Sequence, residues 1–155
     1  MCYCSSPLSF EECCFKIHQD PSKAIQPVQL MKARYSAFSV HNVDFLNQTS
    51  LSSTPLQIKD IDQIRWLHLE VIDAGINCLE GRDQGWVEFK AYFKEARTSM
   101  NEVGLLYEKS AFRFDMSRGH WIYTDGQPTW SSKKMNRNDR CICQSNRKWK
   151  KCCGS

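Results

Sequence analysis

Eight of the nine cysteines in this 155-residue sequence fall into two groups with the same internal spacing. The first group is Cys2, Cys4, Cys13 and Cys14, and the second is Cys141, Cys143, Cys152 and Cys153. In each group a Cys-x-Cys pair is followed, after eight residues, by a Cys-Cys pair. Structural zinc binds four thiolates in a tetrahedron, with Zn–S bonds of about 2.3 Å. The spacing therefore predicts one zinc ion in each group and two per chain.

Other uses of these thiols fit the sequence less well. The start at Met1 has neither the basic nor the apolar segment of a secretory signal, so we expect a cytoplasmic protein whose thiols stay reduced. A redox or thiol enzyme normally uses Cys-x-x-Cys or a lone thiolate beside a base, and neither pattern occurs here. We expect the ninth cysteine, Cys78, to be a small buried apolar side chain. His18 is either a substitute ligand for the first group or, as we expect, a surface histidine.

The charge of the chain is distributed unevenly. From residue 133 to the end there are eight basic side chains and one acid, Asp139, so this tail has a net charge of +7. The whole chain has a net charge of +4, so the remaining residues carry −3. Cations around the second group offset the negative charge of a four-thiolate zinc site, whereas Glu11 and Glu12 flank the first group. We therefore expect the second group to bind zinc more tightly. No apolar run is long enough for a membrane span.

Between the cysteine groups, the spacing of apolar residues changes from the three-to-four-residue period of a helix to the two-residue alternation of a strand. Helices are predicted at 28–40, 43–49 and 58–64, and strands at 65–72, 86–93, 103–116 and 121–124. Residues 50–55 are predicted to be a loop, and 128–138 a polar linker. In the first strand Leu67, Leu69 and Val71 alternate with Trp66, His68 and Glu70. Helices followed by strands indicate an α+β fold with an antiparallel sheet.

The stretch from Arg137 to Gly154 resembles the SEC-C motif, the zinc-binding tail of the SecA translocation ATPase. The usual motif is C-P-C-G-S-G-K-K-Y-K-K-C-C-G, and this chain has Ile142, Gln144 and Asn146 in place of the proline and the first two glycines. We expect Asn146 to keep the turn, because asparagine tolerates a positive φ. The group near Cys2 retains little of the motif beyond the cysteines.

Paired SEC-C-like motifs around a middle containing LMKARYSAF at 30–38 and WIYTDG at 121–126 resemble the YchJ family of bacterial proteins. The resemblance implies a middle domain of the cystatin-like, nuclear-transport-factor-2-like (NTF2-like) fold, a curved antiparallel sheet packed on helices to form a cone. The expected organisation is a zinc motif at 1–18, the middle domain at 26–127 and a SEC-C motif at 136–155. The family resemblance brings no established activity.

Polar and aromatic positions on the predicted strands are candidates for a pocket in the cone: Trp66, Glu88, Tyr107, Glu108 and Trp121. Glu88 or Glu108 is a candidate base if partly buried. The favoured reading is structural, with the aromatic rings packing the sheet and the carboxylates pairing with Arg34 or Arg113. A catalytic triad and a glycine-rich phosphate loop are not found, and the sequence points to a binding protein rather than an enzyme.

Three functions agree with these observations. The first is a zinc-stabilised adaptor that docks a protein partner through the cysteine motifs, as the SecA tail binds the chaperone SecB. The second is nucleic-acid or ribosome binding by the basic tail, with Trp130 and Trp149 stacking on bases. The third is binding or catalysis of a small molecule in the central cone. The sequence favours the first.

Overall fold

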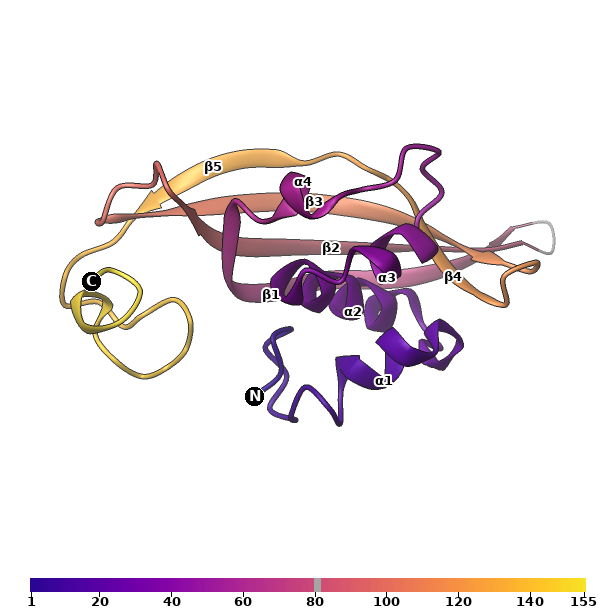
Figure 1. The fold of residues 1–155 in the computed structure, drawn as a ribbon, viewed down its shortest axis with the longest axis horizontal. Helices are drawn as coiled ribbons and strands as arrows, with labels where there is room; N and C mark the ends of the chain where they lie inside the picture. The colour runs from indigo at the N-terminus through magenta and orange to yellow at the C-terminus, as the bar shows by residue number, and fades with distance from the viewer. Residues whose placement is uncertain (80–81) are drawn as a thin grey trace.

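The computed structural model describes residues 1–79 and 82–155. In this part of the chain the largest element is a curved antiparallel sheet (Figure 1). Its strands are β1 (Ile64–Leu79), β2 (Arg82–Glu95), β3 (Glu102–Asp115), β4 (His120–Gly126) and β5 (Thr129–Lys134). Strands β1, β2 and β3 are neighbours in that order. The far edge of β3 is shared, because β4 pairs with its second half and β5 with its first half.

The helices cover one face of this sheet (Figure 1). They are α1 (Cys14–Gln19), α2 (Pro27–Val40), α3 (Val43–Gln48) and α4 (Ile58–Ile61), with short 3-10 turns at Pro21–Lys23 and Trp149–Lys151. Helix α2 begins with Pro27, whose fixed φ suits a first helical position. It ends at His41 in a left-handed conformation with φ of 59°. Among the described residues, no helix combines the length and the apolar character needed to cross a membrane.

Two groups of buried side chains hold the fold together. The larger group lies between the helices and the sheet and includes Leu30, Phe45, Leu46 and Val87, each with at most 1% of its surface exposed. The smaller group joins strands β2 and β3 to the C-terminal segment, and consists of Tyr92, Val103, Met135, Cys141 and Trp149. The C-terminal motif therefore packs on the sheet and does not extend freely from it.

A bulge in β1 changes which of its side chains face the helices. The pairing of β1 with β2 shifts register between Trp66 and His68, and the extra residue is Leu67. A bulge reverses the alternation of side chains on either side of it. As a result Trp66 and Leu69 both pack with the helix-side core, while Leu67 packs with the smaller group.

The predicted α+β fold with an antiparallel sheet is confirmed, although several details differ. The helix predicted at 58–64 ends at Ile61, and the strand predicted at 65–72 continues to Leu79. The strict alternation predicted along 65–72 was wrong, because the bulge at Leu67 places Trp66 with Leu69. The linker predicted at 128–138 was also wrong, because Thr129–Lys134 forms strand β5. All six side chains of β5 are exposed, so no apolar alternation marks it. Main-chain pairing with β3 and the contact of the Trp130 ring with Phe93 hold it in place.

Candidate metal centres and the central pocket

The N-terminal cysteines meet in a compact turn beneath helix α2. The amide of Ser5 donates to the carbonyl of Cys2 at 3.0 Å, and Ser5 has a φ of 70°, so the chain reverses directly after Cys4. The second pair of cysteines lies where α1 begins, at Cys14. The four sulfur atoms lie within 4.8 Å of one another. We call residues 1–18 the N-terminal knuckle.

Helix α2 buries most of this knuckle. Cys2, Cys4 and Cys14 are each at most 3% exposed, and Cys2 Sγ lies 3.8 Å from Ser36 Oγ. His18 is also packed inward, because its Nε2 contacts the carbonyl of Ala33 at 2.7 Å. His18 is therefore neither one of the clustered ligands nor the surface histidine expected from the sequence. Its pKa is lowered by burial.

The C-terminal cysteines are gathered by a similar turn, which we call the C-terminal knuckle (137–155). The amide of Cys141 donates to the carbonyl of Arg147, and the amide of Gln144 donates back to Cys141. Gln144 and Asn146 have φ values of 60° and 63°, so both positions adopt the conformation that favours glycine. The expected turn at Asn146 is thus present. The four sulfur atoms again lie within 4.8 Å of one another.

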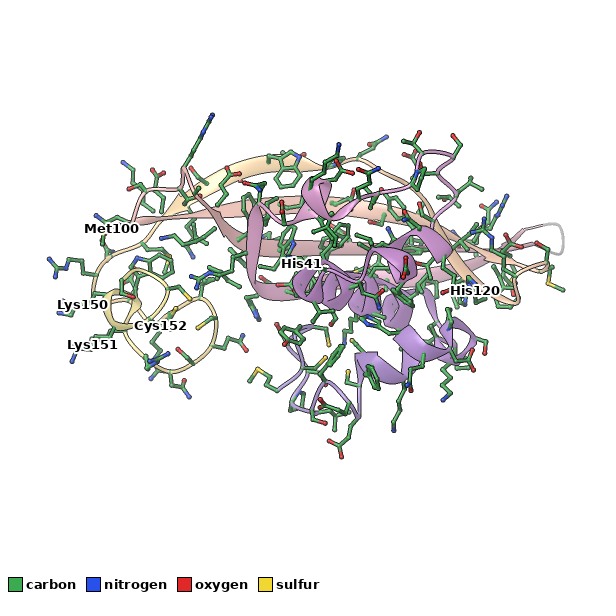
Figure 2. The ribbon with its side chains drawn as sticks, viewed as in Figure 1. His41, Met100, His120, Lys150, Lys151 and Cys152 are labelled. Carbon is green, nitrogen blue, oxygen red and sulfur yellow. The ribbon has the colours of Figure 1, made fainter. Side chains whose placement is uncertain are left out.

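Trp149 anchors this knuckle to the sheet. Its side chain is fully buried, and its indole Nε1 donates to the carbonyl of Met100 at 2.9 Å. Figure 2 shows Met100 at the turn between β2 and β3, next to the loop that carries Lys150, Lys151 and Cys152. The Lys94 ammonium lies 5.0 Å from the centre of the indole ring. Gly154 leaves room for the indole, because a Cβ there would lie 2.2 Å from Nε1.

The sulfur–sulfur distances fit a tetrahedral zinc ion. Zn–S bonds of about 2.3 Å give a tetrahedron with edges of about 3.8 Å. In the N-terminal knuckle Cys13 Sγ lies 3.7 Å from Cys4 Sγ and 3.9 Å from Cys14 Sγ. In the C-terminal knuckle Cys152 Sγ lies 3.5 Å from Cys143 Sγ and 4.0 Å from Cys153 Sγ. All nine cysteines are free thiols, so both clusters could hold a metal ion.

Each cluster concentrates negative charge on one sulfur. A hydrogen bond from the Cys14 thiol is the main cause that lowers the pKa of Cys4 to about 5. A hydrogen bond from Ser145 is the main cause that lowers the pKa of Cys152 to about 6. Burial meanwhile raises the pKa of Cys13 to about 11. A divalent cation would take the place of the shared protons, so metal binding would release them.

The two knuckles differ in the charges around them. Arg147 donates from Nη2 to Cys152 Sγ at 3.5 Å, which places a cation directly on the C-terminal cluster. The exposed basic residues around that cluster are Arg137, Arg140, Arg147, Lys148 and Lys151. At the N-terminal knuckle the neighbouring charges are the exposed acids Glu11 and Glu12 and one exposed cation, Lys16. The Ser9 hydroxyl donates to the Glu12 carboxylate at 2.9 Å.

A single histidine on β1 contacts both knuckles. Its Nδ1 lies 2.9 Å from Ser5 Oγ, and its Nε2 lies 3.2 Å from the side-chain nitrogen of Gln144. Ser5 follows Cys4 directly, and Gln144 follows Cys143, so the two partners of His68 are equivalent positions of the repeated motif. The bulge at Leu67 positions His68 for these contacts. No pattern in the sequence predicts this contact, because the bulge and the docking of both ends depend on tertiary structure.

The candidate pocket residues fall into three separate places. Trp66 and Glu108 line a cavity of about 540 Å³ between the helices and the sheet. Glu88 and Tyr107 lie on the opposite face of the sheet, where the Tyr107 hydroxyl donates to Glu88. Trp121 is buried and donates to the carbonyl of Ile25 at 3.1 Å. The five residues therefore do not form one site.

The expected pairing of these carboxylates with Arg34 or Arg113 was wrong. In the described part of the chain, the one ion pair within 4.0 Å joins Arg118 to Asp115. Glu108 instead accepts a hydrogen bond from Ser110 at 2.8 Å, and burial raises its pKa. Arg34 donates to the carbonyl of Leu46 and to Thr49 Oγ1.

Two further expectations about single residues were wrong. Cys78 is exposed on β1, where its thiol donates to Asp83 at 3.2 Å, because this part of the long strand extends beyond the helices. Trp149 is buried under its knuckle and is therefore not available to stack on a nucleic-acid base. Trp130 remains 53% exposed, with its ring against Phe93.

Comparison with known proteins agrees with this architecture. Residues 26–126 match the family described as "YchJ, middle NTF2-like domain", and residues 137–155 match the SEC-C motif. A UPF0225 protein of Vibrio cholerae serotype O1 is 35% identical, over 99% of each chain. The crystal structure of a SEC-C motif containing protein from Psychrobacter arcticus has a TM-score of 0.61 and 31% identity, covering 97% of this chain and 88% of that one.

A second solved structure has the same fold. The solution structure of RPA3114, a SEC-C motif containing protein from Rhodopseudomonas palustris, has a TM-score of 0.65 at 24% identity. It covers 81% of this chain and 96% of that one. The middle domain, the C-terminal motif and the full-length relatives together show that the chain belongs to the YchJ (UPF0225) family.

Proposed function

We propose that this protein is an adaptor with two zinc knuckles, which docks an acidic protein partner through its C-terminal knuckle. The observation that carries the zinc assignment is the pair of four-sulfur clusters with edges close to those of a Zn–S₄ tetrahedron. The proposal places Cys2, Cys4, Cys13 and Cys14 on one ion and Cys141, Cys143, Cys152 and Cys153 on the other. A cytoplasmic location is part of it, because the thiols must stay reduced.

The role of zinc is structural in this proposal. Four cysteine ligands leave no open position for a substrate or water, unlike a catalytic zinc site. Each knuckle is too short to bury a core of its own, so metal binding supplies much of its folding free energy. The fully buried Trp149 then fixes the folded knuckle to the sheet, because its indole donates a hydrogen bond to the carbonyl of Met100.

The proposed partner surface is the exposed basic side of the C-terminal knuckle. Its cations have no ion-pair partner among the described residues, where the one pair joins Arg118 and Asp115. A rigid basic surface favours encounter with an acidic protein surface. Nucleic acid is a less favoured partner, because one of the two tryptophans expected to stack on bases, Trp149, is buried.

We also propose that the C-terminal knuckle binds zinc more tightly. The Arg147 guanidinium contacts Cys152 and offsets the negative charge of four thiolates on a divalent ion. The N-terminal cluster is more deeply buried and has acids nearby, so its net negative charge is less well compensated.

Zinc per chain, measured by elemental mass spectrometry together with a free-thiol count, tests the metal assignment. The protein should keep its native start, because Cys2 is a proposed ligand. We expect two zinc ions, one in Cys14→Ser and one in Cys152→Ser. Cys78→Ser is the matched control and keeps both. Absence of zinc from the wild type, with reactive thiols, contradicts the assignment. Cys14→Ser keeps only the C-terminal ion and Cys152→Ser only the N-terminal one, so loss of zinc from Cys14→Ser at lower chelator concentration than from Cys152→Ser contradicts the proposed order of affinity.

The partner is tested by crosslinking in cells followed by mass spectrometry, with charge-reversed variants. Arg140→Glu and Lys148→Glu invert exposed charges on the C-terminal knuckle, and Lys59→Glu is the control on α4. We expect the first two to lose an acidic partner while retaining both zinc ions. Crosslinks that survive both reversals contradict docking through this surface. Binding to RNA or DNA that weakens steeply with salt would instead support the nucleic-acid alternative.

A further inference from the structure

The cavity between the helices and the sheet combines an apolar wall with a small set of polar groups. Its volume of about 540 Å³ lies within the usual range of about 300–1,000 Å³ for small-molecule sites. Trp66, Phe89, Leu106 and Phe112 provide much of the apolar lining. Such a lining suits a flat apolar molecule and leaves the polar groups to determine its orientation.

Arg34 is the unusual group in this cavity. It is only 8% exposed, and within the described chain no carboxylate lies within 4.0 Å of it. A buried cation without a counter-ion is costly. The groups in direct contact with Arg34 are neutral: the carbonyl of Leu46, Thr49 Oγ1, and the ring of Tyr123, whose centre lies 4.9 Å from the guanidinium carbon. Glu108 lies beyond ion-pair distance, and its charge favours that of Arg34 only from there.

Among the described residues, one edge of this guanidinium has no hydrogen-bond partner. Both hydrogen bonds of Arg34 to protein acceptors come from Nη1, at 2.9 and 2.8 Å. In the described chain every fully buried side-chain nitrogen or oxygen has a partner, so Nε and Nη2 keep some accessible surface. Arg34 is one of the residues that line the cavity. Two parallel N–H donors on one guanidinium edge match the two oxygens of a carboxylate.

We propose that this cavity is a binding site for a small aromatic carboxylic acid, held through the Nε–Nη2 edge of Arg34. The apolar body of the ligand lies against Trp66 and Phe89. Glu108 accepts a hydrogen bond from a hydroxyl or amino group on that body. The inference does not depend on the zinc knuckles or on the proposed protein partner.

Glu108 restricts the class of ligand further. It lines the same cavity, accepts from Ser110 at 2.8 Å and lies 3.5 Å from the Tyr123 hydroxyl. The Tyr123 ring thus lies next to both Arg34 and Glu108. A ligand that fills the site needs an acceptor at one end for Arg34 and a donor at the other for Glu108. A plain dicarboxylate meets repulsion at Glu108, and a plain amine leaves Arg34 unpaired.

The test is an amide-resonance NMR titration of the zinc-loaded full chain with phenylacetate, 4-hydroxyphenylacetate and indole-3-acetate, each paired with its neutral amide. We expect saturable shifts of cavity residues, including the Trp66 indole, with each acid at least tenfold tighter than its amide. One charge-assisted bidentate contact of about 1.5–3 kcal/mol corresponds to roughly ten- to hundredfold in affinity. The phenolic acid should bind more tightly than phenylacetate, because its hydroxyl reaches Glu108.

Variants separate the proposed contacts from the general apolarity of the cavity. Arg34→Lys keeps the charge and should weaken the acids at least tenfold, while leaving the amides unchanged. Glu108→Gln should remove the preference for 4-hydroxyphenylacetate over phenylacetate. Arg113→Met is the control, because Arg113 is an exposed arginine on β3, the strand that carries Glu108, and lies outside the cavity. It should leave the affinity for every ligand unchanged.

Three outcomes would overturn the proposal. One is equal affinity for acids and amides in the wild type, which tests the idea even if Arg34→Lys fails to fold. Another is stronger binding of tyramine than of 4-hydroxyphenylacetate, which would mean that the cavity binds cationic ligands through the Glu108 carboxylate. The third is failure of all three acids to give saturable shifts of cavity residues.

Discussion

Ser5 and Gln144 are equivalent residues of the two knuckles, and they contact opposite nitrogens of the same imidazole ring, that of His68. The two cysteine motifs are thus joined through one residue of the middle domain, although 76 residues separate His68 from Gln144. Ser5 Oγ also accepts from the main-chain amide of Leu69 at 3.2 Å. The N-terminal knuckle, the edge of β1 and the C-terminal knuckle therefore form one continuous contact.

Replacing His68 should loosen both knuckles without removing their metal. We expect His68→Phe, which keeps the ring stacked on Tyr92, to lower the free energy of unfolding by about 1–2 kcal/mol, because two hydrogen bonds are lost. Hydrogen exchange should become faster at Ser5 and at Gln144. The matched control is Arg65→Phe, at an exposed position on the same strand. Unchanged exchange at one of the two turns would show that His68 does not join them.

Removal of zinc should open the C-terminal knuckle to proteases. Its exposed basic residues are trypsin sites that the folded turn protects, and metal binding supplies the folding free energy of such short segments. We expect a strong chelator to give cleavage at Arg140, Arg147 and Lys148, while the sheet stays intact. Limited proteolysis followed by mass spectrometry measures this. Chelator-independent cleavage would mean that the knuckle folds without metal.

Stability should fall as the pH drops below about 6.5, partly because of His18. Burial lowers the pKa of His18 in the folded chain below the value of 6.5 taken for the unfolded chain. Between the two values the unfolded chain binds more protons, so acid favours unfolding. The loss begins near pH 6.5 and ends at the lower folded pKa. His18→Gln should show a smaller fall between pH 7.5 and 5.5 in thermal melts, and an equal fall would contradict this role.

The turn at Asn146 should be sensitive to the residue it carries. Its φ of 63° costs an ordinary L residue about 1–2 kcal/mol, while asparagine and glycine adopt it more easily. We expect Asn146→Ala to reduce zinc retention and Asn146→Gly to preserve it, as judged by competition with a chelator. Ser145→Ala is less suitable as a control, because Ser145 contacts Cys152. Asn138→Ala, at an exposed position before the first cysteine, is the better one.

Glu108→Gln should stabilise the protein at neutral pH. Burial raises the pKa of Glu108, so its charged form is disfavoured in the folded chain, and the amide avoids that cost while still accepting from Ser110. The folded pKa is the higher one, so the wild type gains relative stability as the pH falls and loses it as the pH rises. The difference between variant and wild type in thermal melts should therefore grow from pH 4 to pH 7. A variant less stable at pH 7 would contradict this.

The sequence was sufficient for features that depend on local spacing. The doubled cysteine pattern predicted which eight thiols gather, and the change of period predicted helices followed by an antiparallel sheet. Features set by distant contacts were not predicted. Strand β5 has only exposed side chains, so its pairing with β3 leaves no apolar pattern. The register shift at Leu67 and a second one between Val71 and Asp73 interrupt the alternation along β1. The buried indole of Trp149 donates to the carbonyl of Met100, 49 residues away.

The candidate pocket was predicted only in part, for the same reason. Trp66 and Glu108 reach the cavity, but Glu88 and Tyr107 face the other side of the sheet. Arg34 was expected to neutralise a carboxylate, yet its partners are a carbonyl, a hydroxyl and an aromatic face. Which face of a strand a residue occupies depends on register, and register is set by the paired strand.

The contact of Ser5 with Leu69 also bears on aggregation. An exposed strand edge offers unpaired amides to another chain. The outer edge of β4 is occupied by the segment at Thr49–Leu51, which exchanges main-chain hydrogen bonds with Tyr123, and β5 carries Lys133 and Lys134. On β1 the amide of Leu69 is occupied by the N-terminal knuckle. Loss of metal from that knuckle would therefore expose a template for intermolecular strand pairing, so zinc depletion should lead to self-association as well as to local unfolding.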